Sequence, residues 1–182
     1  MEKRSTCCFT GHRPRSLPWG NNEQDLRCVH LKVLLRQEIQ RLITKNNVTH
    51  FISGMAIGTD LIAAEVVLEL KKQYQKITLE SAIPHEEQAA HWAVAQREKY
   101  YDIASRCDTE TMIQGMYTPD CFRKRNQYMV EHSAYVIAVW NGKPSGTSQT
   151  VMLAREKNRF LTMINPKTLE ITRVNQLHMA QE

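Results

Sequence analysis

The sequence predicts an α/β fold: a three-layer α/β/α sandwich with a mostly parallel sheet. Two observations lead to this prediction. Short apolar runs alternate with longer segments of helical spacing along the whole chain, and no Ser/Gly-rich linker or internal repeat divides them. Parallel strands need crossover connections, which place helices on both faces of the sheet. With 182 residues, the chain is expected to form a single domain over 1–182.

Five elements are expected in the first half of the chain. Each strand is a short apolar run, and each helix has apolar residues three or four positions apart. They are a strand over 6–11, a helix with Leu31, Leu35, Ile39 and Leu42 on one face, a strand over 50–54, a helix with Leu61, Ala64 and Leu68 on one face, and a strand over 76–84.

Six elements are expected in the second half. Thr118 is a good N-cap and Pro119 suits the first position of a helix, so a helix is predicted to start there. The six expected elements are a long helix over 86–105, a strand with few apolar residues over 108–115, the helix after Thr118, a strand over 134–140, a helix over 149–158 and a strand over 159–166.

Composition excludes several classes of protein. The longest uninterrupted apolar run, 134–140, is far shorter than the ~20 residues of a membrane-spanning helix, and the N-terminus lacks the apolar stretch of a signal peptide. We therefore expect a cytoplasmic protein without a membrane partner. Five cysteines with no CxxC pair predict reduced thiols that fill the core, with neither a disulfide framework nor a metal site.

The net charge of +5 would suit a polyanion, but the basic residues are scattered among acidic ones. Only the "RKR" stretch at 123–125 forms a cluster, and three residues on one helical turn are weak support for a nucleic-acid surface. A mixed, solvated surface is the simpler interpretation, and a nucleic-acid partner is not expected.

Unusual residues follow three of the predicted strands. In parallel sheets, ligands bind beyond the carboxyl ends of the strands, so these residues are predicted to share one site. They are Gly11, His12 and Arg13 after the first strand, Ser53, Gly54, Met55, Gly58, Thr59 and Asp60 after the second, and Gly146, Thr147 and Ser148 after the strand over 134–140.

Two of these loops open a helix, where unpaired backbone N–H groups attract anions. Two such helix starts at neighbouring strand ends would suit the diphosphate of a nucleotide, with Arg13 neutralising its charge. The spacing matches neither G-x-G-x-x-G nor the lysine-containing P-loop. Taken singly, the glycines at 54 and 58 are equally explained as a tight turn, with Asp60 compensating the helix dipole.

Two further positions were weighed. Asn126 lies at helical spacing with Phe122, Met129 and Ser133, so it is expected to face inward and either tie down a loop or contact a ligand. His85 and His91 are six positions apart, which does not put two histidines on one metal, so they are interpreted as a solvated helix start.

The motifs "TGHRP", "SGMAIGTD", "IPHEEQAAHW", "FRKRNQYMVEHSAYVIAVWNG" and "SGTSQTV" occur in this order through most of the chain. They resemble those of the YpsA-type bacterial proteins of the SLOG superfamily, which also includes DprA and the Lonely Guy phosphoribohydrolases. The resemblance implies one SLOG-like, Rossmann-like domain. It also implies a sensor or adaptor that binds a nucleotide-derived ligand, ADP-ribose or an NAD-related product, at the "SGMAIGTD" and "SGTS" loops.

The sequence departs from the Lonely Guy motif, Pro-Gly-Gly-x-Gly-Thr-x-x-Glu. Ser145 stands at a glycine position, and Thr150 stands where the glutamate that serves hydrolysis would fall. A threonine is a poor substitute for a carboxylate in acid–base chemistry, so binding without cleavage is expected.

Two alternatives stay open. A nucleotide N-glycosidic hydrolase would use Asp60 as its carboxylate. A single-stranded DNA binder of DprA type would use Arg123, Lys124 and Arg125 with Trp19 as an exposed aromatic. The sequence leaves open whether the chain forms a homo-oligomer or has a protein partner.

Overall fold

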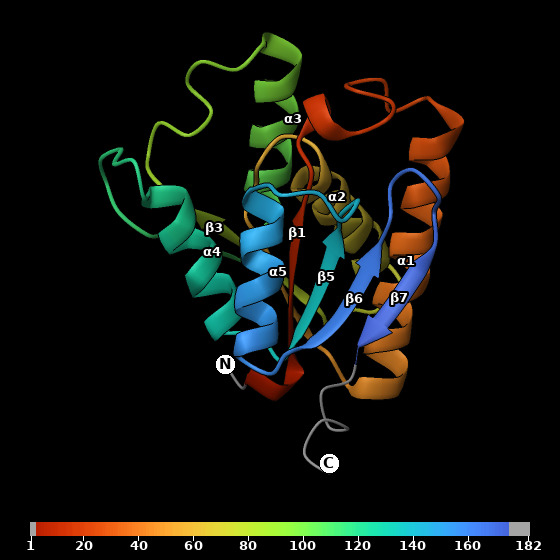
Figure 1. The fold of residues 1–182 in the computed structure, drawn as a ribbon. Coiled ribbons are helices and arrows are strands. Elements are labelled where there is room, and N and C mark those ends of the chain that lie inside the picture. Colours follow the sequence, from red (N-terminus) through yellow and green to blue (C-terminus); the bar gives the residue numbers. More distant parts are fainter. Residues whose placement is uncertain (1–2, 175–182) are drawn as a thin grey trace.

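The computed structural model describes residues 3–174 and confirms the α/β fold (Figure 1). Seven strands form one sheet in the order β4-β3-β2-β1-β5-β6-β7. All neighbouring strands are parallel except β6 and β7, which are antiparallel. The strands are β1 Thr6–Gly11, β2 His50–Ser53, β3 Thr78–Ile83, β4 Thr109–Met112, β5 Tyr135–Val139, β6 Phe160–Ile164 and β7 Ile171–Val174.

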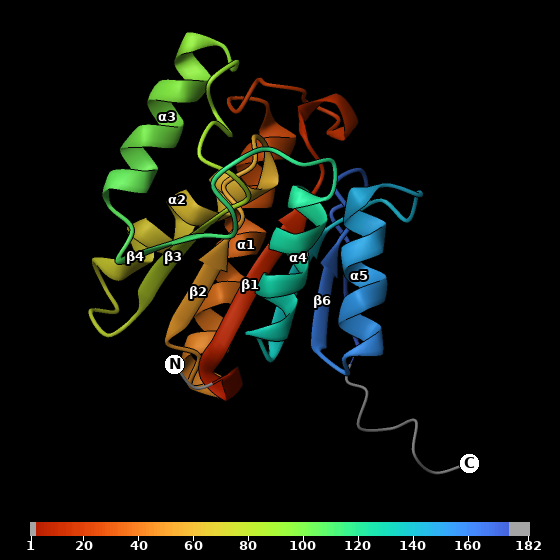
Figure 2. The same ribbon diagram turned by 90° about the vertical axis from the view of Figure 1, so that its left-hand side faces the viewer.

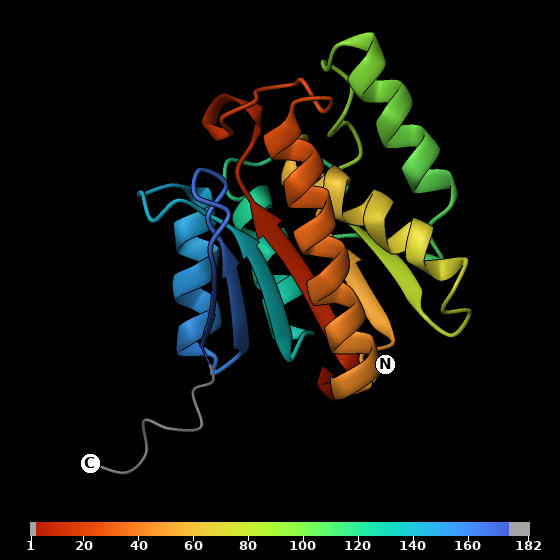
Figure 3. The ribbon, with the colours of Figure 1, turned by 90° about the vertical axis from the view of Figure 1, so that its right-hand side faces the viewer.

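Helices cover both faces of this sheet, as parallel connections require. Figure 2 shows α4 and α5 in front of one face, and Figure 3 shows α1 and α2 in front of the other, with α3 beside α2. The helices are α1 Leu26–Asn46, α2 Thr59–Lys71, α3 Val94–Ser105, α4 Cys121–Glu131 and α5 Gly146–Glu156, and the short 3₁₀ turns are η1 Lys3–Ser5 and η2 Pro14–Ser16.

Each face of the sheet has its own hydrophobic core. The larger core packs Phe9 and Phe51 of the sheet against Leu35 of α1 and Val67 of α2. The smaller core lies under α4 and α5. Alternate residues of β1 point into opposite cores, as the two-residue period of a strand dictates: Cys7 and Phe9 lie in the larger core, and Cys8 lies in the smaller one.

The predicted helix over 86–105 is too long, because α3 begins only at Val94. Residues 85–92 form successive turns, in which the N–H groups of Gln88, Ala90 and Trp92 each bond the carbonyl three positions earlier. The interpretation of His85 as solvated is also wrong. Its side chain is buried, and its ring lies edge-on to the rings of Tyr117 and Phe122.

Other boundaries also differ from the prediction. The fourth helix starts at Cys121 with Asp120 in the N-cap position, two residues after the predicted cap, and Thr118 donates its hydroxyl to the Asp120 carboxylate. The antiparallel edge strand β7 was not anticipated. Over residues 3–174, no helix combines the length and the apolar composition that crossing a bilayer requires.

Candidate functional site

A cavity of about 330 Å³ opens beyond the carboxyl ends of β1 and β5, and we call it the β1–β5 cavity. The chain leaves β1 toward β2 on one side and later returns as β5 on the other, so the strand order reverses at this point. Gly11 and Val139 are paired in the sheet, so the loops that follow the two strands emerge side by side. Such a reversal is where ligands bind in open parallel sheets.

The structure brings only part of the predicted site together. Seven of the predicted residues line the β1–β5 cavity: Gly11, His12, Arg13, Asp60, Asn126, Gly146 and Thr147. Six predicted residues do not line it: Ser53, Gly54, Met55, Gly58, Thr59 and Ser148. The cavity is also lined by Thr10, Arg15, Ser16, Ala56, Phe122, Arg125 and Ser145, which were not predicted as ligand contacts.

The N-terminus of α5 faces the cavity. Ser145 caps this helix: its hydroxyl accepts the Ser148 N–H at 3.2 Å, and the Ser148 hydroxyl accepts the Ser145 N–H at 2.8 Å. The capping box therefore uses both polar groups of Ser148, which explains why this residue is not a cavity residue. The backbone N–H groups of Gly146 and Thr147 lie in the first turn, where a helix offers no internal acceptor.

At the N-terminus of α2, the predicted second phosphate cradle, the first residue of the helix already has an acceptor within the protein. The backbone N–H and the hydroxyl of Thr59 both donate to the carbonyl oxygen of His12, at 3.3 and 3.1 Å. Gly58 has a φ of +98°, and a Cβ placed there would lie 2.7 Å from the same oxygen. This glycine therefore lets the loop after β1 pack against the start of α2.

Gly54 has a different structural role. A Cβ at Gly54 would overlap the guanidinium of Arg125, which donates to the Gly54 carbonyl oxygen. Arg125 also lies 3.7 Å from the carboxylate of Asp60, and both side chains are buried. The "RKR" stretch is therefore not a surface cluster, because the register of α4 turns its third residue into the protein.

Burial dominates the ionisation of Asp60. It raises the pKa of the carboxyl above its usual range, and the opposing effect of Arg125 is smaller. The carboxylate also accepts the Ala56 N–H at 3.4 Å, a long hydrogen bond. Asp60 is thus held inside the loop after β2, and its exposed fraction is 5%.

Asn126 ties the two predicted loops together. Its oxygen accepts a hydrogen bond from Nε of Arg125 at 2.8 Å, and its amide nitrogen donates to the Thr150 hydroxyl at 2.9 Å. The Thr150 hydroxyl in turn donates to the Gly146 carbonyl at 3.2 Å. A continuous chain of hydrogen bonds therefore runs from Gly54 to the first turn of α5.

Positive charge dominates the cavity. Three arginines line it, and within the part of the chain that the structure describes Asp60 is the one carboxylate that does so. The Arg13 guanidinium lies over the Phe122 ring, 5.1 Å from its centre, which holds an otherwise exposed side chain in place. The His12 ring accepts the Asn141 N–H at Nε2 (3.3 Å). In the part of the chain that the structure describes, the Arg13 guanidinium forms no ion pair.

Helical spacing from the predicted Asn126 could have identified two of the residues that were missed, Phe122 and Arg125. Phe122, Arg125 and Asn126 are three and four positions apart on α4, so they share one face. Trp19 is not the exposed aromatic that the DNA-binding alternative required, because its exposed fraction is 6%.

Comparison with known proteins agrees with this architecture. A sequence model of the YspA SLOG family matches residues 7–172. The SPbeta prophage-derived protein YoqJ of Bacillus subtilis is 33% identical over 138 residues, covering 69% of this chain and 81% of YoqJ. A UPF0398 protein of Halalkalibacterium halodurans is 29% identical over 170 residues, covering 89% and 88% of the two chains.

Two solved structures share the fold. DNA processing protein A of Helicobacter pylori, described for its single-stranded DNA binding mode, superposes with a TM-score of 0.59 at 19% identity, over 90% of this chain. DprA of Streptococcus pneumoniae has the same TM-score at 16% identity. This chain spans only 66% of the first protein and 51% of the second.

Proposed function

The chain belongs to the YspA SLOG family, and on this premise we propose that it binds a nucleotide-derived ligand with a diphosphate, such as ADP-ribose, in the β1–β5 cavity. The observation that carries the proposal is the first turn of α5, which faces a cavity lined by three arginines. A helix N-terminus and arginine side chains both stabilise phosphate oxygens. Gly146 offers the closest approach, because a Cβ there would meet no atom within 4 Å.

The size of the cavity indicates which part of the ligand enters it. About 330 Å³ is at the small end of ligand sites, which typically hold roughly 300–1,000 Å³. We propose that the phosphates contact the N–H groups of Gly146 and Thr147, and that Arg13 and Arg15 lie across from them. Arg125 already donates to the Gly54 carbonyl and pairs with Asp60. It therefore contributes positive charge to the site without donating to the phosphates.

We further propose that the ligand is bound without being cleaved. The carboxylate nearest to the ligand, Asp60, is buried beside Arg125 and serves as an acceptor for the loop backbone. The hydroxyl of Thr150 is engaged with Asn126 and Gly146. Neither group is free to act as the general base that hydrolysis of an N-glycosidic bond would need.

Single-stranded DNA is the second candidate, because DprA of Helicobacter pylori is described as binding it and shares this fold. The side chains of Arg123 and Lys124 both pair with Asp120, at 3.4 and 3.2 Å, so the basic stretch carries less free charge than its sequence suggests. A strand of DNA would also need stacking platforms along a basic groove. These features favour the small ligand.

Isothermal titration calorimetry tests the proposal with ADP-ribose, ADP, adenosine and a single-stranded oligonucleotide. We expect ADP-ribose to bind most tightly and adenosine at least tenfold more weakly, about 1.4 kcal/mol. Arg13→Ala should weaken ADP-ribose binding at least tenfold, whereas Arg155→Ala, an exposed arginine at the other end of α5, should not.

Chromatography of the recovered ligand should show it intact. Equal binding of ADP-ribose by the wild type and by Arg13→Ala, or binding of neither ADP-ribose nor ADP, would refute the phosphate site. Release of free ribose phosphate or of the free base would show that the protein hydrolyses the ligand, and the hydrolase alternative would then replace the binding proposal. Tight, salt-sensitive binding of the oligonucleotide alone would favour the DNA candidate.

A further inference from the structure

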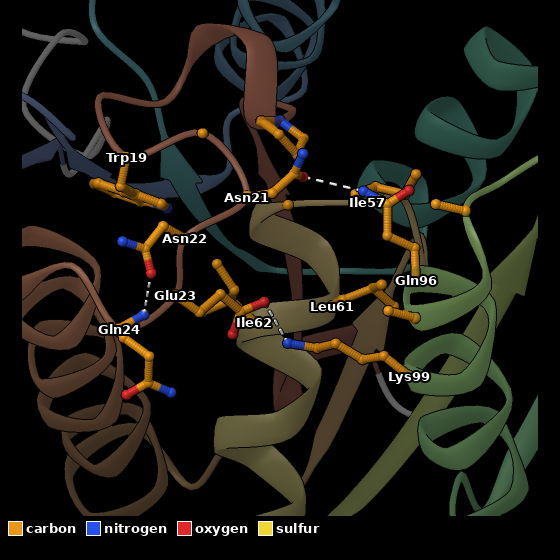
Figure 4. A pocket seen from close by; sticks show the side chains of 15 residues that line it. Trp19, Asn21, Asn22, Glu23, Gln24, Ile57, Leu61, Ile62, Gln96 and Lys99 are labelled. Atoms are coloured by element: carbon orange, nitrogen blue, oxygen red, sulfur yellow. Dashed lines mark hydrogen bonds and ion pairs between the residues drawn. The ribbon is translucent and has the colours of Figure 1, made fainter.

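A second and larger cavity, of about 590 Å³, lies on the opposite side of the loop after β1, and we call it the Trp19 cavity. It is bounded by the segment 19–24, the first turns of α2 and the start of α3 (Figure 4). Pro14 and Ile57 line it, whereas their neighbours Arg13 and Ala56 line the β1–β5 cavity. The packed loops thus form a wall between two separate spaces.

One wall of the Trp19 cavity carries an unused hydrogen-bond donor. The indole of Trp19 is 6% exposed, and within residues 3–174 its Nε1–H has no acceptor. Figure 4 shows the Trp19 side chain at the wall of the cavity, and because its nitrogen atom is itself buried, the ring must turn for the N–H to reach a ligand. A buried donor without an acceptor destabilises the folded state, so an acceptor supplied by a ligand would be stabilising.

The rest of the lining suits a flat ring with polar edges. Ile57, Leu61 and Ile62 supply further apolar side chains to the lining, with Ile57 and Leu61 on the side of Gln96 (Figure 4). Across the mouth, the Gln96 amide donates to the Asn21 side-chain oxygen at 3.0 Å. This bond leaves the Asn21 amide hydrogens and the Gln96 oxygen to meet acceptors and donors of a ligand.

Charge distinguishes the Trp19 cavity from the β1–β5 cavity. Lys99 pairs with Glu23 at 2.5 Å and with Glu65 at 2.8 Å. Lys32 pairs with the same two carboxylates, at 2.7 and 3.7 Å. The charges of the two lysines and the two glutamates cancel. The site therefore lacks the net positive charge that would attract a phosphate, and it favours an uncharged group.

We propose that the Trp19 cavity binds a planar, uncharged nitrogen heterocycle, of the kind found in nucleobases and in nicotinamide. The Trp19 Nε1–H donates to an acceptor atom of the ring, the aliphatic side chains of α2 contact its face, and the Asn21 and Gln96 amides contact its edge. The site is separate from the phosphate site and does not depend on it.

Nuclear magnetic resonance of the tryptophan indole N–H groups tests this site directly. The chain has three tryptophans, and Trp19→Phe identifies the signal of Trp19. Trp140 is an internal reference, because its Nε1–H already donates to the Lys143 carbonyl at 2.7 Å. Adenosine or nicotinamide should move the Trp19 signal and leave the Trp140 signal in place, whereas ribose should move neither.

A matched pair of variants locates the binding. Ala95 is exposed and lines the Trp19 cavity, and the neighbouring Val94 is exposed but does not line it. Ala95→Phe should fill the cavity and abolish the shift of the Trp19 signal, whereas Val94→Phe should preserve it. Circular dichroism will establish that both variants fold. The inference is wrong if adenosine and nicotinamide at millimolar concentration leave the Trp19 signal unchanged, or if Ala95→Phe retains the response.

Arg13→Ala separates this inference from the proposed function. The variant should lose ADP-ribose affinity and keep the response of the Trp19 signal to adenosine or nicotinamide. If Arg13→Ala also abolishes that response, the heterocycle binds in the β1–β5 cavity and the second site does not exist. A response to only one of the two probes supports the site and identifies whether its ring is a purine or a pyridine.

Discussion

The side-chain amide of Asn126 donates to the hydroxyl of Thr150 at 2.9 Å and thereby joins α4 to α5. The same amide accepts a hydrogen bond from Arg125, which reaches the Gly54 carbonyl. The start of α5 and the loop after β2 are thus held by one set of hydrogen bonds. The position of the proposed phosphate site depends on residues that need not touch the ligand.

Replacing Asn126 by alanine should lower stability and ligand affinity together. The change leaves the buried Nε of Arg125 without its acceptor, which costs about 1–3 kcal/mol. Urea denaturation and calorimetry with ADP-ribose measure the two effects. Gln127→Ala is the control, because its side chain is exposed and, within residues 3–174, bonds only Glu131. Unchanged stability of Asn126→Ala would contradict the structural role of this amide.

The two glycines at the helix starts should respond differently to a larger side chain. Gly58→Val should lower the free energy of unfolding by about 1–3 kcal/mol, because φ is +98° and the new Cβ approaches the His12 carbonyl oxygen. Gly146→Val should remain stable, since a Cβ there meets open space, and should weaken ADP-ribose binding. Thermal unfolding and calorimetry distinguish the two. A stable Gly58→Val protein would contradict the close packing of the loops.

Removal of the charge partner of Asp60 should make stability depend on pH. Burial raises the pKa of this carboxyl in the folded protein, and Arg125 opposes the rise. In Arg125→Met the pKa rises further above the unfolded value of about 3.9. The folded state then binds more protons than the unfolded state, so the free energy of unfolding falls as pH rises through this window.

We therefore expect Arg125→Met to be destabilised by about 3–5 kcal/mol at neutral pH and less at acid pH. Urea denaturation between about pH 4 and 8 measures this trend. Adding Asp60→Asn should remove the extra pH dependence. If the variant follows the wild-type pH profile, Asp60 is not the titrating group.

The cysteines should react slowly in the folded protein. Burial raises the pKa of Cys8 to about 12 and those of Cys28 and Cys107 to about 11. Almost no thiolate is then present at pH 8, and only the thiolate is nucleophilic. A chromogenic disulfide reagent should find five thiols after denaturation and far fewer before it, with the partly exposed Cys107 reacting first. Rapid reaction of all five in the native state would rule out this packing.

Local patterns account for what the sequence predicted well. The strand over 134–140 was recognisable because a strand buried on both faces is a continuous apolar run, and the helix with Leu31, Leu35 and Ile39 on one face because burial of one face imposes a period of about 3.6 residues. The helix over 86–105 was predicted too long because its first half has helix-forming composition. There the Gln88 amide donates to the Met55 carbonyl at 3.0 Å, a contact with a distant part of the chain.

By itself, the sequence determined the order of strands and helices as far as β6, and it predicted the strand ends at which a ligand site would form. These features follow from hydrophobic spacing and turn residues, which are local. Only the tertiary structure showed which N–H groups at the helix starts already have an acceptor within the protein. The His12 carbonyl occupies the N–H of Thr59, whereas the first turn of α5 faces a cavity. The tertiary structure also showed that Arg125 points inward to Asp60. A buried charge needs a partner of opposite charge, and this partner is distant in the sequence, so no local pattern reveals it.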